Sequence, residues 1–91
     1  MVREQVKART IVRNPRILFG EPTVEGTRIS VRTIVLARYM FGSAERVQEQ
    51  LPTLRIPDIE AALDYYQDHR DEINAHIAEN NEDEDIPYER L

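Results

Sequence analysis

The chain contains no cysteine and no tryptophan, and it has only three glycines. Without cysteine it forms no disulfide, offers no thiolate ligand to zinc and has no cysteine nucleophile. Long apolar runs are also missing, because the longest, Ile34 to Ala37, falls far short of the ~20 residues that span a membrane. The first residues lack the apolar stretch of a secretory signal. These absences predict a soluble, cytoplasmic protein rather than a secreted or membrane-embedded one.

What the chain does contain is enough for one small domain. Its 91 residues are 41% apolar and 32% charged. A domain of this size buries roughly 60–65% of the surface of its unfolded chain. That is sufficient for a single hydrophobic core and too little for a large enclosed substrate cavity.

Charge is distributed unevenly along the chain. Residues 1–46 carry nine Lys or Arg and four Asp or Glu, whereas residues 47–91 carry three and thirteen. Residues 79–91 alone have a net charge of −5. This asymmetry favours two different partners, one polyanionic and one basic, although a simply solvated charged face explains the same pattern.

Short β-type runs separated by turn residues dominate the first third of the chain. Residues 1–9 are polar and mixed in charge, and we predict that they form a flexible basic arm. Two short β-type runs, Pro22-Thr23-Val24 and Thr27-Arg28-Ile29, flank Glu25 and Gly26. This pattern is typical of a β-hairpin, because glycine adopts a positive φ at no steric cost. The sequence therefore predicts a hairpin over about 10–30.

Helical periodicity begins after Ser30, a residue type that favours helix N-caps. It predicts three helices, over about 31–41, 43–50 and 57–78. The first is apolar over most of its surface and is expected to be the central core helix. The third keeps its apolar period from Ile59 to Ile77, whereas residues 79–91 lose it and are predicted to be a disordered acidic tail. The predicted fold is mainly α, with residues 10–78 forming one domain.

No constellation of residues typical of an enzyme is present. The only histidines, His69 and His76, are seven residues apart, whereas two zinc ligands on one helix are usually three or four apart. The glycines are spaced too widely for a phosphate-binding loop. Carboxylates are numerous, but we expect them on solvated helix surfaces where nothing shifts their pKa values. We predict no catalytic residue, no metal and no cofactor.

Three short helices with a small hairpin are the layout of helix-turn-helix DNA-binding domains. Basic side chains around the hairpin and the helix ends are the candidate phosphate contacts, namely Lys7, Arg9, Arg13, Arg28, Arg32 and Arg55. The third helix argues against this use, because its early exposed residues would include Asp58, Glu60 and Asp64, which repel phosphates. The alternative is a small helical fold whose surface arginines bind no DNA.

Two further residues each allow two interpretations. Arg28 either contacts phosphate or folds back onto carbonyl groups or a carboxylate such as Glu25, and we favour the second. Tyr65 and Tyr66 are neighbours on a helix and point about 100° apart, so both cannot face one core. Tyr66 belongs to the apolar stripe, which leaves Tyr65 either half-exposed or on a surface that binds a partner.

One stretch of the chain has a distinctive spacing. It begins with Asn14-Pro15-x-Ile17 and Gly20-Glu21-Pro22-x-x-x-Gly26-Thr27-Arg28-Ile29-x-Val31, and continues with Gly42-Ser43, Leu51-Pro52-x-Leu54 and Ile59-x-x-Ala62-Leu63-x-Tyr65-Tyr66. This pattern, over about residues 10–70, resembles the bacterial family called domain of unknown function 433. Ile56 stands where that family usually has a Thr or Ser cap for the third helix.

The resemblance implies a homeodomain-like, three-helix fold with a β-hairpin. It also implies a role similar to that of VapB-type antitoxins, as one half of a type II toxin–antitoxin pair. The implied partner is a PIN-like ribonuclease toxin, with operator DNA as a second partner for autorepression. We expect a homodimer or higher oligomer, since a dimer places two basic arms on successive half-sites. A stand-alone helix-turn-helix or protein-adaptor module without a toxin is the alternative.

The acidic tail suggests how such a toxin would be blocked. A PIN-like ribonuclease needs basic residues to hold RNA, and the segment Glu82-Asp83-Glu84-Asp85 would occupy them. Ile86 and Tyr88 would act as apolar anchors, and the tail would become ordered on binding. A tail that only keeps the chain soluble is the alternative.

Overall fold

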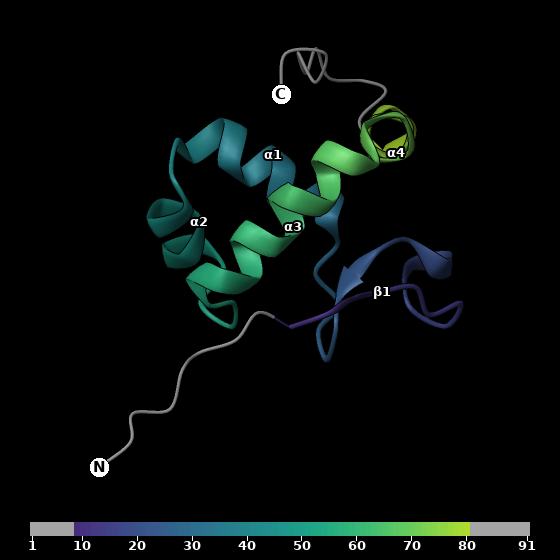
Figure 1. The fold of residues 1–91 in the computed structure, drawn as a ribbon, viewed down its shortest axis with the longest axis horizontal. Coiled ribbons are helices and arrows are strands. Elements are labelled where there is room, and N and C mark those ends of the chain that lie inside the picture. The colour runs from purple at the N-terminus through teal and green to yellow at the C-terminus, as the bar shows by residue number, and fades with distance from the viewer. Residues whose placement is uncertain (1–8, 81–91) are drawn as a thin grey trace.

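Four helices and a two-stranded sheet make up residues 9–80, the part of the chain that the computed structural model describes (Figure 1). In chain order the elements are β1 (Ile11–Val12), a short 3-10 helix η1 (Leu18–Gly20), β2 (Thr23–Val24), α1 (Val31–Phe41), α2 (Ala44–Gln50), α3 (Ile56–Asp68) and α4 (Arg70–Asn80). The protein is therefore mainly helical, with a small antiparallel sheet near its N-terminus.

The predicted turn at Gly26 is present, but the main partner of β2 is β1 and not the segment that follows the turn. β2 pairs antiparallel with β1, so that Ile11 lies opposite Val24, and it also forms a single bridge from Thr23 to Ser30. Gly26, at φ 80°, makes the tight turn that we expected between β2 and the segment leading to Ser30. β2 thus pairs with β1 on one side and makes the single bridge to Ser30. The chain before β1 lies close to α3, because the Arg9 amide donates to Asp58.

α1 and α2 owe their ends to the capping residues visible in the sequence. The hydroxyl of Ser30 accepts a hydrogen bond from the Thr33 amide at 3.0 Å, and Ser43 caps α2 in the same way at 3.2 Å. Between the two helices Gly42 adopts a left-handed conformation with φ 92°. This conformation ends α1 at little steric cost and turns the chain directly into α2.

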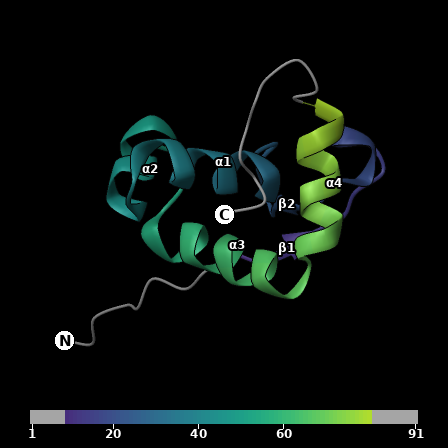
Figure 2. The same ribbon diagram turned by 90° about the horizontal axis from the view of Figure 1, so that it is seen from above.

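The single long helix predicted over 57–78 is wrong, because the chain breaks at His69 into α3 and α4. His69 leaves the helical region with φ −136° and ψ 36°. One straight helix would place Ile77 about 27 Å from Ile59, beyond the end of a core built on α1, which is itself only about 16 Å long. The break turns α4 sharply away from the axis of α3, as Figure 2 shows. Ile73 and Ile77 are then completely buried, which a continuous helix would prevent.

The core lies between α1 and α3, with α2 at one end and α4 at the other (Figure 2). Twelve hydrophobic residues are buried in it: Val24, Val31, Ile34, Val35, Ala37, Val47, Leu54, Ile59, Ala62, Tyr66, Ile73 and Ile77. Tyr66 keeps its hydroxyl satisfied by donating to Asn74 Oδ1 at 2.8 Å. Within residues 9–80 every helix is too short or too polar to traverse a lipid bilayer.

Candidate functional site

The first of the predicted phosphate contacts, Arg9, is bound to Asp58 at the start of α3. Its backbone amide donates to Asp58 Oδ1 at 2.8 Å and its Nε donates to Oδ2 at 3.1 Å. The guanidinium also reaches the Thr53 carbonyl at 2.6 Å. Arg9 therefore ties the chain before β1 to the beginning of α3.

Asp58 itself corrects two expectations from the sequence. We placed it on an exposed, DNA-facing surface, but it is completely buried. Burial alone would raise the pKa of its carboxyl group, yet the hydrogen bonds from the Arg9 and Arg55 amides and from the Arg9 guanidinium outweigh that effect and hold the pKa below its usual value. Ile56 is the first residue of α3, and Arg55 is its N-cap. The Arg55 amide donates to Asp58 Oδ2 at 3.0 Å, so Asp58 supplies the carboxylate of a capping box at the start of α3.

Arg13 is bound at the opposite end of α3, where the chain passes into α4. It donates to both carboxylate oxygens of Glu72, with a distance of 2.7 Å to Oε1, and to the hydroxyl of Tyr65. Hydrogen bonding from Arg13 is the main reason why the pKa of Glu72 is lowered. Glu72 is the second carboxylate, after Asp58, whose pKa shifts where we expected no shift.

Tyr65, for which we left open a half-exposed position or a surface that binds a partner, is half-buried in contacts within the chain. Its ring stacks on that of His69 with centroids 3.9 Å apart and planes 8° from parallel. His69 Nδ1 lies 2.9 Å from the Tyr65 carbonyl, one turn back. The pair stabilises the break between α3 and α4, and the use of Tyr65 by a partner stays a prediction.

Two more of the candidate arginines also lie against carboxylates. Arg32 Nε is 2.7 Å from Glu21 Oε1, and both side chains are largely buried, at 17% and 7% exposure. Arg55 Nε is 3.4 Å from Asp58 Oδ2. These contacts fix the loop before β2 to α1 and close the start of α3, so both arginines have a structural task.

Arg28 is the exception among the candidate arginines. It lies on the turn around Gly26 and is exposed, and it forms no hydrogen bond or ion pair with any other residue in the described range 9–80. The pairing with Glu25 that we favoured is therefore not seen there. Lys7 lies outside the described residues, as do the predicted tail contacts Glu82, Asp83, Glu84, Asp85, Ile86 and Tyr88.

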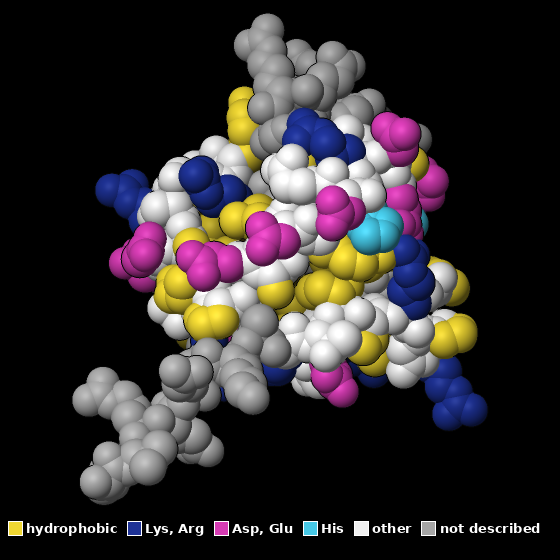
Figure 3. Space-filling view, viewed as in Figure 1, with side chains coloured by type: hydrophobic (Ala, Val, Ile, Leu, Met, Phe, Trp, Pro, Cys, Tyr) yellow, Lys and Arg dark blue, Asp and Glu magenta, His cyan; other side chains and the backbone are white. Residues whose placement is uncertain are grey.

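The outer face of α3 is acidic. Glu60, Asp64 and Asp68 follow one another at intervals of four residues and are all exposed. Figure 3 shows acidic side chains along the course of α3 across this face of the molecule. Among residues 9–80 no group of three His, Asp or Glu side chains is placed to hold a metal ion.

An unusual turn, residues 16–20, projects between β1 and β2. Leu18 and Phe19 both adopt positive φ, at 50° and 55°, a conformation that is uncommon for residues other than glycine. Backbone hydrogen bonds close the turn, from Ile17 to Asn14 at 2.8 Å and from Glu21 to Leu18 at 3.0 Å. Phe19 is nevertheless fully exposed, with 102% of its reference surface accessible.

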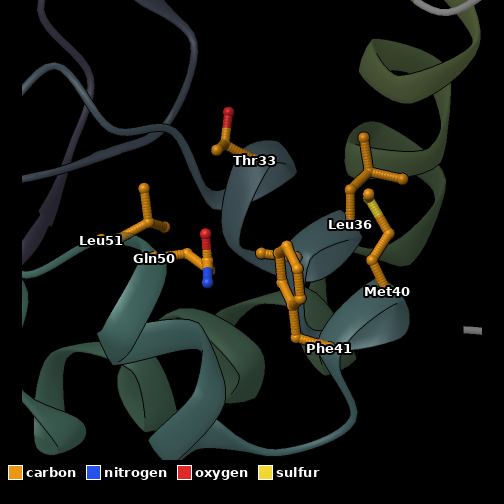
Figure 4. A pocket seen from close by; sticks show the side chains of 7 residues that line it. Thr33, Leu36, Met40, Phe41, Gln50 and Leu51 are labelled. Carbon is orange, nitrogen blue, oxygen red and sulfur yellow. The ribbon is translucent and has the colours of Figure 1, made fainter.

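A second apolar surface lies between α1 and α2, as Figure 4 shows. It is a groove of about 330 Å³ lined by Thr33, Leu36, Ala37, Met40, Phe41, Gln50 and Leu51. None of these side chains carries a charge, and Met40 is 65% exposed. We refer to this surface as the α1–α2 face.

Neither apolar surface was predicted from the sequence, for different reasons. Nothing in the apolar run from Ile17 to Gly20 indicates that Leu18 and Phe19 are exposed. The α1–α2 face did leave a signal, because Thr33, Leu36, Ala37 and Met40 recur at helical spacing on a side of α1 away from Val31 and Val35. We interpreted a helix that is apolar over most of its surface as the central core helix, and one of its apolar sides is open.

Comparison with known proteins gives one family and nothing more specific. A family described as "Protein of unknown function (DUF433)" matches residues 11–66, which run from β1 to the end of the buried part of α3. No curated protein and no solved structure matches the chain. The matched range contains the 16–20 turn, the Arg28 turn and the α1–α2 face, but not α4.

Proposed function

The chain belongs to the DUF433 family, whose function is unknown, and we propose, as the resemblance implies, that it is an antitoxin of a type II toxin–antitoxin pair. In this role it binds a PIN-like ribonuclease in the cytoplasm and neutralises it by direct protein contact. The VapB-type antitoxin-like role and the homeodomain-like arrangement of helices are parts of the same proposal.

The observation that carries the proposal is the exposed Phe19 on the 16–20 turn. A phenylalanine side chain that is fully exposed contributes no burial to folding, and its left-handed backbone is a conformation that glycine would adopt with less strain. Folding therefore does not explain why a large aromatic group stands there. Binding to a pocket of another protein explains the exposed ring, because a rigid aromatic anchor loses little conformational entropy when it binds.

The charges of the described residues also favour a protein partner over DNA. Arg9, Arg13, Arg32 and Arg55 all lie against carboxylates of the chain. The exposed acidic residues of α3 would repel phosphates, whereas they are compatible with the basic surface by which a ribonuclease holds RNA.

The test is neutralisation of the ribonuclease encoded in the adjacent reading frame. The two proteins are co-expressed, and growth and co-purification are measured for the wild type and for Phe19→Gly. We expect the substitution to weaken binding by at least about tenfold, because it removes a central aromatic anchor. Tyr39→Ser is the matched control, since it removes an exposed aromatic ring from α1 and should leave binding unchanged.

Two results would count against the antitoxin role. A neighbouring protein that neither binds the chain nor harms the cell would remove the basis for it. A Phe19→Gly chain that neutralises the toxin as well as the wild type would show that the 16–20 turn is not the anchor.

The acidic tail is tested separately by ending the chain after Asn80. A shorter chain ending at His76 would also remove Ile77, which is completely buried, and would confuse loss of contacts with loss of folding. If residues 82–88 occupy basic groups of the toxin, the truncated chain should neutralise the toxin less well than the full chain. Added salt should reduce this difference in neutralisation, because it screens the charges involved. Equal neutralisation by both chains would leave the tail with a solubilising role only.

Operator DNA is the second candidate partner, and the exposed Arg28 favours it. This guanidinium is available for a phosphate contact, whereas Arg32 is committed to Glu21. We expect binding to the upstream DNA to weaken steeply with salt, and Arg28→Gln to reduce that slope by about one unit. Arg13→Gln is a poor control because it breaks the pair with Glu72, so Arg46→Gln, on α2, is used instead. No detectable binding at low salt would reject a DNA-binding role.

A further inference from the structure

α1 carries a second apolar stripe that the core covers only in part. Val31, Ile34 and Val35 are buried against α3, whereas Leu36 and Met40 lie on another side of the same helix. A helix at the surface of a globular protein normally has one apolar stripe and one polar face. The second stripe of α1 continues through Phe41 into Leu51, and together these side chains form the wall of the α1–α2 face (Figure 4).

The shape of the α1–α2 face combines a projection with a hollow. Met40 stands out with 65% of its surface accessible, next to a groove of about 330 Å³ that is large enough to receive a side chain of that size. Methionine is flexible and packs well into irregular apolar spaces that include an aromatic ring, such as that of Phe41. A surface that carries both parts is suited to contact with its own copy, because a two-fold axis brings each projection to the other hollow.

The charges around the α1–α2 face lead to the same partner. The exposed charged side chains of α2 closest to its lining residue Gln50 are Arg46, one turn earlier on the same side, and Glu49, its neighbour in sequence, one of each sign. Neither forms an ion pair with another residue of the described range. Nucleic acid and an acidic or basic protein would each meet repulsion from half of this rim. A second copy related by a two-fold axis can place its Glu49 opposite Arg46 and its Arg46 opposite Glu49.

We propose that the α1–α2 face binds the same face of a second copy and forms a two-fold symmetric homodimer. Its uncharged centre and mixed polar rim correspond to the usual anatomy of a protein interface. Figures 1 and 2 place α2 and the turn between β1 and β2 at opposite ends of the molecule, so each copy keeps its 16–20 turn free. The dimer does not depend on the antitoxin role, and it would present two such turns to partners.

The first test measures the mass of the full chain in solution by sedimentation at several micromolar concentrations. We expect a dimer for the wild type and a monomer for Met40→Glu, because a dimer would bury two unpaired carboxylates at its centre. Met40 is exposed, so its replacement should leave the circular dichroism spectrum and melting curve of the monomer unchanged. Phe19→Glu is the matched control, since it places the same charge on the other large apolar surface and should remain a dimer.

The second test uses the rim. Arg46→Glu leaves only negative charge at positions 46 and 49 of both copies, and Glu49→Arg leaves only positive charge there. Each substitution should raise the dissociation constant of the dimer about tenfold. An equal mixture of the two variants should form a heterodimer close to the wild type in affinity, because opposite charges then face one another across the axis. This recovery is expected only if the same face is used by both copies.

Three results would overturn the proposal. The first is a wild type that sediments as a monomer at every concentration, and the second is a Met40→Glu variant that remains a dimer. The third is loss of the dimer in Phe19→Glu, which would assign the interface to the 16–20 turn. A monomeric wild type whose affinity for the ribonuclease falls on Met40→Glu would assign the α1–α2 face to the toxin instead.

Discussion

Single residues in this protein join parts of the chain that are far apart in sequence. Asp58 is the central case, because its two oxygens accept hydrogen bonds from the backbone and side chain of Arg9, 49 residues away, and from the backbone of Arg55. The same carboxylate caps α3 and holds the segment before β1. Its replacement should therefore affect the whole fold rather than one helix end.

Asp58→Asn should lower the free energy of unfolding by about 3–5 kcal/mol, the usual effect of removing one partner from a buried ion pair. Urea denaturation measures this value at pH 7. Glu60→Gln, on the exposed side of the same helix, is the control and should change stability by less than about 0.5 kcal/mol.

The same variant gives a prediction about pH. Because the folded pKa of Asp58 lies below its ordinary value, the stabilisation is complete above the ordinary aspartate pKa of about 4 and is lost as pH falls through the folded pKa. The stability difference between wild type and Asp58→Asn should therefore shrink on acidification below about pH 4. A difference that stays constant down to pH 2 would contradict this account.

Phe19 is the residue whose backbone and side chain are least explained by folding. At φ 55° a glycine avoids the steric cost of a left-handed side chain, which is about 1–2 kcal/mol, although it loses more entropy on folding. Phe19→Gly should leave the free energy of unfolding unchanged or raise it by up to about 1 kcal/mol. Thermal or urea unfolding of the isolated chain measures this, and a clear loss of stability would show that Phe19 has a contact within the fold.

At the scale of elements, the division of one predicted helix into α3 and α4 is the main difference from expectation. Apolar spacing alone cannot reveal it, because Ile59, Tyr66, Ile73 and Ile77 would share one stripe on a straight helix as well. No glycine or proline marks the break at His69. Its cause is the limited length of the core, which α4 can reach only by turning back. Capping residues and Gly42, by contrast, act locally, and the ends of α1 follow from the sequence.

Ile73→Ala should destabilise the fold by about 2–5 kcal/mol, because it leaves a cavity where α4 packs onto the core. Urea denaturation is the measurement, and Glu79→Ala, an exposed position on the same helix, is the control. If α4 were an independent helix that only follows α3, the two substitutions would have similar small effects.

At the scale of the whole molecule, part of the basic charge of the sequence forms ion pairs within the fold, which the net charge does not reveal. Four of the candidate arginines bind carboxylates in the fold: Arg9, Arg13, Arg32 and Arg55. In the first three of these pairs the partners are 11 to 59 positions apart in sequence. Much of the basic charge is therefore neutralised within residues 9–80. Most of the acidic excess of residues 79–91 lies outside the described residues.

A chain ending after Asn80 should unfold with a free energy within about 0.5 kcal/mol of the full chain. The physical reason is that residues 81–91 are largely acidic and lack apolar periodicity, so they have little to contribute to a core. Urea denaturation of the two chains tests it. A larger loss of stability in the short chain would mean that residues 81–91 pack against the fold.

The sequence by itself determined the mainly helical class, the turn at Gly26, the ends of α1 and the family, because caps, turns and apolar periods depend on residues a few positions apart. Only the tertiary structure decided which arginines are bound, where the third predicted helix breaks and which apolar side chains remain open. Arg13 and Glu72 lie 59 positions apart, and the exposure of Phe19 and Met40 depends on what packs beside them. Such contacts arise from the packing of distant segments around one small core, and local patterns do not encode that packing.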